Sequence, residues 1–287
     1  MKKIICVVLA LVALQGFAQI KLGGSDILAP IIEKDIATLA KNVGLKLDVN
    51  MRGTYMAYPD LNSGAIDVAI IACPKGRALP KDCIALPIAY QVAIVIVNSV
   101  NPMEEITTKQ LYSIYSRNVD VRSETWSSLG VNDASLRNIM PLSTSFSDGL
   151  VVELFKAEAI NGTNIGSWVN IMKKPQDVIS TVKTNNSAIG VVGKVGKVDM
   201  IKVMPVVKVG KEKSYAYSPD QTSIYNGDYP LVLPFYVVFK KTNAKKVKSL
   251  VRVLLDDKIA NTLDSTDFFS ASKESRKKSI FELDLLK

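Results

Sequence analysis

The stretch that decides the fold is Asn101–Tyr115, which reads NPMEEITTKQLYSIY. Its second half, from Thr107 to Tyr115, predicts a helix. The longest apolar strand predicted for the chain, Ile88 to Asn98, comes directly before it. We therefore interpret the region from Pro102 to about Asp199 as a second lobe inserted into the first.

Strands and helices alternate along the rest of the chain. The further expected strands are Ile20 to Gly23, Leu45 to Met51, Ile66 to Ala72, Leu136 to Leu142, Ala188 to Val192, Met204 to Val209 and Leu231 to Phe239. The further expected helices are Ile27 to Asn42, Tyr58 to Ser63, Leu150 to Ala159, Pro175 to Thr184, Ala244 to Asp256 and Lys258 to Leu263. Near-continuous apolar strands separated by helices indicate parallel sheets covered on both faces. The predicted fold class is α/β, with each lobe a mostly parallel sheet flanked by helices.

Two crossings between the lobes are expected, near Asn98 to Pro102 and near Met200 to Pro205. The first lobe would then comprise residues 19–99 and 205–287, and the second lobe residues 100–204. Two connecting segments of this kind suit a hinge, because domain closure usually concentrates in a few connecting residues.

Residues 1–18 have the pattern of a secretory signal peptide. Lys2 and Lys3 precede the apolar run Ile4 to Leu14, and Ala18 is a small residue at the expected cleavage site. The alternative is a buried N-terminal strand. No later apolar run has the length of a membrane span. We expect the mature protein to be soluble and either periplasmic or secreted.

Composition favours an anionic ligand and argues against catalysis. The formal net charge is +9, which attracts anions in a weak, long-range way. Nucleic acid is not expected as a partner, because the basic residues are dispersed and aromatic residues make up 7% of the chain. The absence of histidine excludes Ser-His-Asp and Cys-His catalysis and His-based zinc sites. We therefore expect neither an enzyme nor a cofactor or metal.

Two cysteines, Cys73 and Cys83, remain after the expected cleavage. Their separation suits a disulfide closing the loop between them in an oxidising compartment. The alternative is a pair of inert thiols. We expect the disulfide.

The opening stretch, with Trp126 and Gly130 after it, resembles the signature N-P-x-x-x-(I/L)-T-x-x-Q-L-x-x-I-(F/Y) … W-x-x-(L/V)-G of PstS-type periplasmic phosphate-binding proteins. Four further segments are similar to motifs of the same family, in the same order: Gly24–Pro30, Gly53–Asp67, Ala188–Gly190 and Tyr229–Tyr236. The resemblance covers nearly the whole mature chain.

This resemblance implies a two-lobed periplasmic-binding-protein-like fold of type II with two hinge crossings. It implies a monomeric receptor that captures a small oxyanion, most often phosphate, between its lobes. Such a receptor delivers its solute to a membrane ABC permease. The signature residues themselves are expected to shape a lobe and not to line the ligand site.

Three turns that precede helices fall where the family's anion loops are expected. Backbone N–H groups at helix starts bind oxyanions well, and neighbouring hydroxyls add donors. The expected ligand-binding residues are Gly24, Ser25, Asp26, Gly53, Thr54, Ser145, Ser147, Asp148 and Gly149. The structural alternative is that the serines and aspartates among them are ordinary N-caps.

The third of these turns departs from the family pattern. It contains no arginine, and Ser143 or Ser145 stands at the arginine position, depending on register. Ala72 and Cys73 stand where many members carry an acidic or polar residue, and Asp26 replaces a serine or threonine.

Two accounts of Asp26 are open. In the first, it accepts a proton from hydrogen phosphate and so replaces the missing polar group. In the second, Asp26 and Asp148 cap their own helices and repel anions. The second account would favour another small solute, or a secreted interaction module without a transport ligand.

Overall fold

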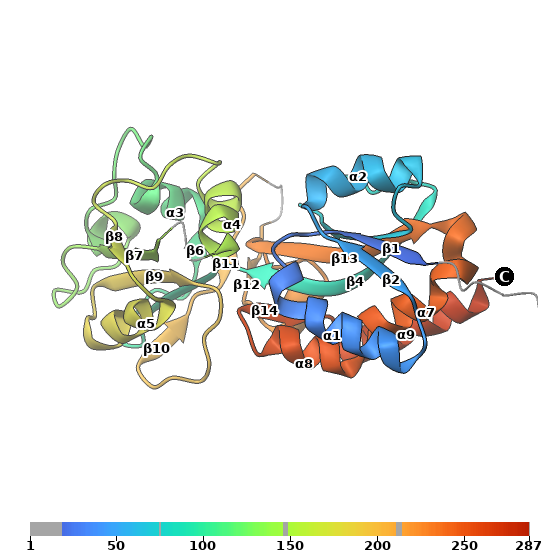
Figure 1. The fold of residues 1–287 in the computed structure, drawn as a ribbon. Coiled ribbons are helices and arrows are strands. Elements are labelled where there is room, and N and C mark those ends of the chain that lie inside the picture. The colour runs from blue at the N-terminus through green and yellow to red at the C-terminus, as the bar shows by residue number, and fades with distance from the viewer. Residues whose placement is uncertain (1–18, 75, 146–148, 211–213, 287) are drawn as a thin grey trace, which may run out of the picture.

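The structure is a computed structural model that describes residues 19–74, 76–145, 149–210 and 214–286. The predicted signal peptide and the predicted site residues Ser147 and Asp148 lie outside the described residues. Two lobes lie side by side, one made of the blue and orange-red elements and the other of the green and yellow ones (Figure 1).

The first lobe is built on a six-stranded sheet in the order β14-β4-β13-β3-β1-β2. Its strands are β1 (Ile20–Gly24), β2 (Leu47–Asn50), β3 (Val68–Ala72), β4 (Cys83–Val92), β13 (Val232–Lys240) and β14 (Phe268–Ser270). β1 runs parallel to β2 and β3, whereas β13 enters antiparallel between β3 and β4. The sheet is therefore mixed, with its parallel part at β1, β2 and β3.

Helices cover both faces of this sheet (Figure 1). They are α1 (Ala29–Asn42), α2 (Thr54–Ser63), α6 (Gln221–Tyr225), α7 (Ala244–Leu254), α8 (Asp257–Asp264) and α9 (Lys273–Leu285), with the short 3-10 helix η3 (Lys241–Asn243). Alternate residues of β3 point to opposite faces. Val68 and Ile70 join the main core, and Ala69 and Ile71 pack in the cluster under α2. Burial on both faces explains the continuous apolar run of this strand.

The second lobe is built on a five-stranded sheet in the order β10-β5-β9-β7-β8. Its strands are β5 (Ile94–Asn98), β7 (Met140–Thr144), β8 (Asn170–Met172), β9 (Ala188–Val192) and β10 (Ile201–Val203). Its helices are α3 (Thr108–Tyr115), α4 (Leu150–Ala159) and α5 (Pro175–Thr184), with the 3-10 helix η1 (Trp126–Leu129). A small sheet in the order β12-β11-β6 joins β6 (Ile106–Thr107), β11 (Val206–Val207) and β12 (Ala216–Tyr217). The two-lobed α/β class predicted from the sequence is confirmed. The prediction that each sheet is mostly parallel is wrong: β4 pairs antiparallel with β13 and β14, and β5 pairs antiparallel with β9 and β10, so both sheets are mixed.

The apolar run Ile88 to Asn98 forms two strands, where one was predicted. β4 ends at Val92 in the first sheet, and β5 begins at Ile94 in the second. Ala93, between them, donates its N–H to the carbonyl of Leu231 at 3.0 Å and accepts a bond from the Tyr229 hydroxyl at 2.9 Å. Strand pairing thus places residues 94–98 with the second sheet. That the lobes move about boundaries after residues 99 and 204 remains a prediction.

The opening stretch folds as its residues predict. Thr107 caps α3: its hydroxyl accepts from the Gln110 N–H at 3.1 Å, and the Gln110 side chain accepts from the Thr107 N–H at 2.8 Å. This reciprocal pair is a capping box, which satisfies two backbone donors at a helix start. Trp126 is fully buried, and its indole N–H donates to the Ser187 carbonyl at 3.1 Å. The signature residues therefore shape the second lobe.

The predicted disulfide between Cys73 and Cys83 is wrong, because both thiols are free. Cys73 lies beside Pro234 near the start of β13, whereas Cys83 pairs with Lys240 at its end. That part of a strand is roughly 20 Å long, and a disulfide needs Cα atoms within about 7 Å. Spacing along the chain gave no sign that β13 would enter between β3 and β4.

We expect thiol titration of the non-reduced protein, prepared from Gln19 onward and unfolded in denaturant, to find two free thiols. Burial raises the pKa of both Cys73 and Cys83, so both should react slowly before unfolding. A reducing agent should leave the melting temperature unchanged. A titre near zero that rises only after reduction would contradict the structure.

Candidate functional site

The first predicted loop joins β1 to α1. Ser25 is buried, donates its N–H to the Ile70 carbonyl at 2.7 Å, and accepts from the Leu28 N–H at 3.4 Å through its hydroxyl. Asp26 is exposed, and α1 has no side-chain cap at its N-cap residue, Leu28. Ser25 thus serves the turn, while Asp26 does not cap its own helix. The account in which Asp26 and Asp148 cap their own helices therefore does not hold for Asp26.

The second predicted loop lies directly against the first. Gly53 donates its N–H to the Gly24 carbonyl at 2.7 Å. A Cβ atom at Gly53 would lie 3.6 Å from a carboxylate oxygen of Asp26. The hydroxyl of Thr54 accepts from the Ala72 N–H at 3.0 Å, which fixes the start of α2 against the end of β3. These contacts therefore bring the five predicted residues of the two loops together, and the end of β3 lies beside them.

The third predicted loop belongs to the second lobe. Ser145 follows β7 and is half-buried, and Gly149 is the N-cap of α4 without a side-chain cap bond. Ser143 is buried and donates to the Thr144 carbonyl at 3.4 Å. α4 lies on the side of the second lobe that faces the first lobe (Figure 1). Whether this loop meets Asp26 and Gly53 across the lobes stays a prediction.

The lobes touch at a junction that the sequence did not reveal. A Cβ atom at Gly193, just after β9, would lie 2.7 Å from Val151 of α4 and 3.3 Å from Asp267 of the first lobe. The Gln91 side chain donates to the Asp267 carbonyl at 3.1 Å. Gly193 thus allows the two lobes to approach closely beside the start of α4.

Lys194 extends this junction into the first lobe. Its ammonium donates to the carbonyls of Asp264 at 2.6 Å, Thr266 at 3.2 Å and Phe268 at 3.2 Å. These carbonyls lie at the end of α8, in the turn after it and at the start of β14. The dipole of α8 favours a cation at its C-terminal end. One side chain of the second lobe therefore holds a turn of the first.

We expect Lys194→Met to lower the free energy of unfolding by about 1–3 kcal/mol, because hydrogen bonds from a charged donor contribute about that much. Chemical denaturation followed by circular dichroism measures the change. Lys197→Met is the matched control, since Lys197 is exposed and near in sequence; it should stay within about 0.5 kcal/mol of wild type. Equal effects of the two substitutions would contradict this role.

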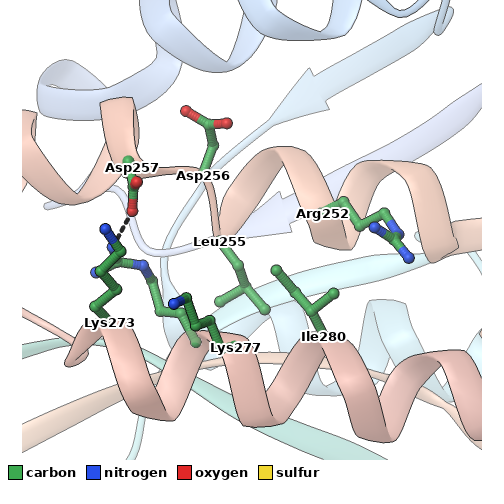
Figure 2. Close-up of a pocket in the computed structure, with 8 residues that line it drawn as sticks. Arg252, Leu255, Asp256, Asp257, Lys273, Lys277 and Ile280 are labelled. Carbon is green, nitrogen blue, oxygen red and sulfur yellow. Dashed lines mark hydrogen bonds and ion pairs between the residues drawn. The ribbon is translucent and has the colours of Figure 1, made fainter.

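A basic pocket of ≈ 300 Å³ lies elsewhere, between α7, α8 and α9 of the first lobe (Figure 2). Arg252, Lys273 and Lys277 contribute positive charge to its lining. The guanidinium of Arg276 pairs with Asp257 and donates to the Ala271 carbonyl at 2.6 Å. Asp257 thus pairs with Arg276, the most buried cation of this pocket. None of the residues that line the pocket was predicted for the ligand site.

Among the described residues, no group of three or more Cys, Asp or Glu side chains is arranged to hold a metal ion. In the same part of the chain, no helix is both long and apolar enough to cross a membrane.

Two lobes, each with a helix-flanked sheet, and paired crossings at Ala93 and Leu231 define the periplasmic-binding-protein class of folds. Residues 12–258 match the family model of the PBP superfamily domain, and the chain belongs to that superfamily.

Three solved structures share this fold. A possible phosphate-binding protein from Planctomyces limnophilus is 19% identical, with a TM-score of 0.70 over 94% of this chain and 99% of that one. PstS from Borrelia burgdorferi is 18% identical, with a TM-score of 0.68 over 88% and 98%. An ABC-type phosphate transport receptor from Vibrio cholerae is 20% identical, with a TM-score of 0.58 over 87% and 99%.

A relative by sequence is Protein SphX of Synechococcus elongatus. It is 23% identical over 246 residues, which cover 82% of this chain and 72% of SphX.

Proposed function

We propose that this protein is a solute receptor that captures an oxyanion, most readily phosphate, between its lobes for an ABC-type transporter. The observation that carries the proposal is the meeting of Asp26, Gly53 and Thr54 at the starts of α1 and α2. The relatives from Planctomyces limnophilus and Vibrio cholerae, described as phosphate-binding or phosphate-transport proteins, support phosphate as the solute.

Helix starts supply the donors for the anion. α2 and α4 each begin after a glycine N-cap, Gly53 and Gly149, that offers no side-chain cap bond. The N–H groups of a first helical turn have no partner within the helix, and the helix dipole makes this end positive. Two such ends, one in each lobe, suit a ligand held between the lobes.

Asp26 gives the site its selectivity in this proposal. A carboxylate accepts a hydrogen bond from a protonated oxyanion such as hydrogen phosphate, and sulfate has no proton to donate. Asp26 is exposed, does not cap α1 and lies against Gly53, so its carboxylate can accept this bond. The site should therefore prefer phosphate over sulfate.

Closure would bring the third loop to the anion. Residues near Ala93 and Leu231 connect the sheets, and a few connecting residues of this kind usually absorb domain closure. The sequence predicts lobe limits near residues 99 and 204, whereas the strand pairing favours limits nearer to Ala93 and Leu231. The receptor would act outside the cytoplasm as a monomer, after removal of residues 1–18, and would bind its solute without changing it chemically.

A thermal-shift and calorimetric screen tests the proposal. The solutes are phosphate, sulfate, molybdate, amino acids and divalent cations. Phosphate at 100 times its Kd should stabilise the protein by about 2.7 kcal/mol. Stabilisation by an amino acid or a cation alone would assign another small solute, as the capping account of Asp26 would favour. No stabilisation by any solute would leave a secreted interaction module.

A further inference from the structure

A phosphate beside Asp26 needs a cation close by. Both groups are negatively charged at neutral pH, so their repulsion weakens binding unless a positive charge offsets it. Arg52 stands next to Gly53, but its guanidinium pairs with Asp60 at 2.9 Å. Lys194 is held by three carbonyls at the lobe junction. Neither of these two cations is free to serve the anion.

Arg77 is a cation without an acidic partner among the described residues. Its guanidinium carbon lies 4.5 Å from the centre of the Tyr58 ring, as in a cation–π contact. Such a contact leaves the guanidinium N–H groups and the full positive charge available. An arginine held on an aromatic face can turn its planar fork toward an oxyanion, which it binds through two parallel hydrogen bonds.

Tyr58 places this guanidinium close to the two loops of the first lobe. Tyr58 follows Thr54 by four positions on α2, so both side chains lie on one helix face, one turn apart. Thr54 is bonded to the end of β3 at Ala72. Asp26 lies against Gly53, Thr54 follows Gly53, and Tyr58 stands one helical turn further on beneath Arg77, so Arg77 lies on the same part of the lobe as the two loops.

Cys73 fixes the other end of Arg77. Its thiol donates to the Arg77 carbonyl at 3.3 Å. The Tyr58 hydroxyl is buried beside this sulfur, and the two groups interact with each other. Burial raises the pKa of Cys73 and of Tyr58, so both stay neutral near pH 7 and leave the charge of Arg77 unopposed.

Arg77 also has room to move. It is exposed and borders a pocket of ≈ 320 Å³ that Cys73, Asn226, Pro234 and Tyr236 line as well. Turning its side chain from the Tyr58 ring toward Gly53 would disturb no buried packing.

We propose that Arg77 binds the captured oxyanion and supplies the positive charge that the segment 142–145 and Gly149 do not contain. Tyr58 acts as a positioning residue that holds the guanidinium beside the loops before the anion arrives. This inference rests on the proposed function, because it assigns a residue to that same site.

Calorimetric titration with inorganic phosphate tests the inference. Arg77→Gln should bind phosphate about 10- to 100-fold more weakly, the range expected for lost charge-assisted hydrogen bonds. It should also show a weaker dependence of Kd on salt, because one cation fewer faces the anion. Arg77→Lys should fall between wild type and Arg77→Gln. Arg52→Gln, the matched control, should stay within about twofold of wild type, since its partner is Asp60.

Tyr58 is tested by two substitutions. Tyr58→Leu removes the ring and should weaken phosphate binding about two- to fivefold, as loss of an exposed cation–π contact implies. Tyr58→Phe keeps the ring and should retain wild-type affinity, which a purely structural role of the hydroxyl would not predict.

The outcomes distinguish a failure of this inference from a failure of the proposed receptor function. Phosphate binding by wild type with equal affinity in a folded Arg77→Gln would overturn the role of Arg77 and leave the receptor function standing. Equal affinities of Arg77→Lys and Arg77→Gln would overturn it too. Wild type that binds no phosphate would overturn the proposed function, and the inference with it.

Discussion

Asp26→Asn is expected to weaken phosphate binding by about 1.5–3 kcal/mol, or about 10- to 100-fold in Kd. The carboxylate of Asp26 lies against Gly53, where the first two loops meet, and it does not cap α1. It can therefore accept a hydrogen bond from the P–O–H group of hydrogen phosphate, and the neutral amide of asparagine is a weaker acceptor. Calorimetry on the two proteins at one pH and salt concentration measures the difference.

The same substitution should act in the opposite direction on sulfate. Sulfate has no proton to donate, so it only suffers the repulsion of the carboxylate, and Asp26→Asn should leave its binding unchanged or stronger. Asp48→Asn on the edge strand β2 removes an exposed carboxylate of the same lobe and should change neither affinity by more than about twofold. Tighter phosphate binding by Asp26→Asn would show that Asp26 repels the anion.

Local signals in the sequence predicted most of the fold. The capping box at Thr107 and the apolar run of β3 depend on neighbours a few residues away, so pattern and propensity determine them. The break at Ala93 carried no such signal, because every residue from Ile88 to Asn98 is buried. A buried apolar residue between two strands looks the same in the sequence as an apolar residue in the middle of one strand.

The meeting of the first two loops was predicted in part. Ser25, Asp26, Gly53 and Thr54 stand at turns that the sequence marks with glycine and hydroxyl residues, and the structure brings them together. The role of Lys194 could not be predicted, because its first carbonyl partner lies 70 positions away. Arg77 was hidden for another reason: its loop was interpreted as one closed by a disulfide.

Gly24→Ala is expected to lower the free energy of unfolding by about 2–6 kcal/mol, from backbone strain and overpacking together. Gly24 has a φ of +126°, and a Cβ atom there would lie 2.1 Å from the carbonyl oxygen of Ile70. That oxygen belongs to the backbone of β3 and already accepts from the Ser25 N–H. The methyl group would therefore push β1 away from β3 at the end that carries the site. Chemical denaturation followed by circular dichroism measures the loss.

Phosphate binding should fall together with stability, because the Gly53 N–H bonds to the Gly24 carbonyl at 2.7 Å and so depends on the position of that residue. Gly44→Ala is the matched control: Gly44 also has a positive φ, of +70°, but has no atom within 4 Å of its Cβ position. Its loss should be about 1–2 kcal/mol, the cost of a left-handed conformation alone. If Gly24→Ala cost no more than Gly44→Ala, β1 and β3 would not approach as closely as described. The contact between the loop at Gly24 and the loop at Gly53 would then need another explanation.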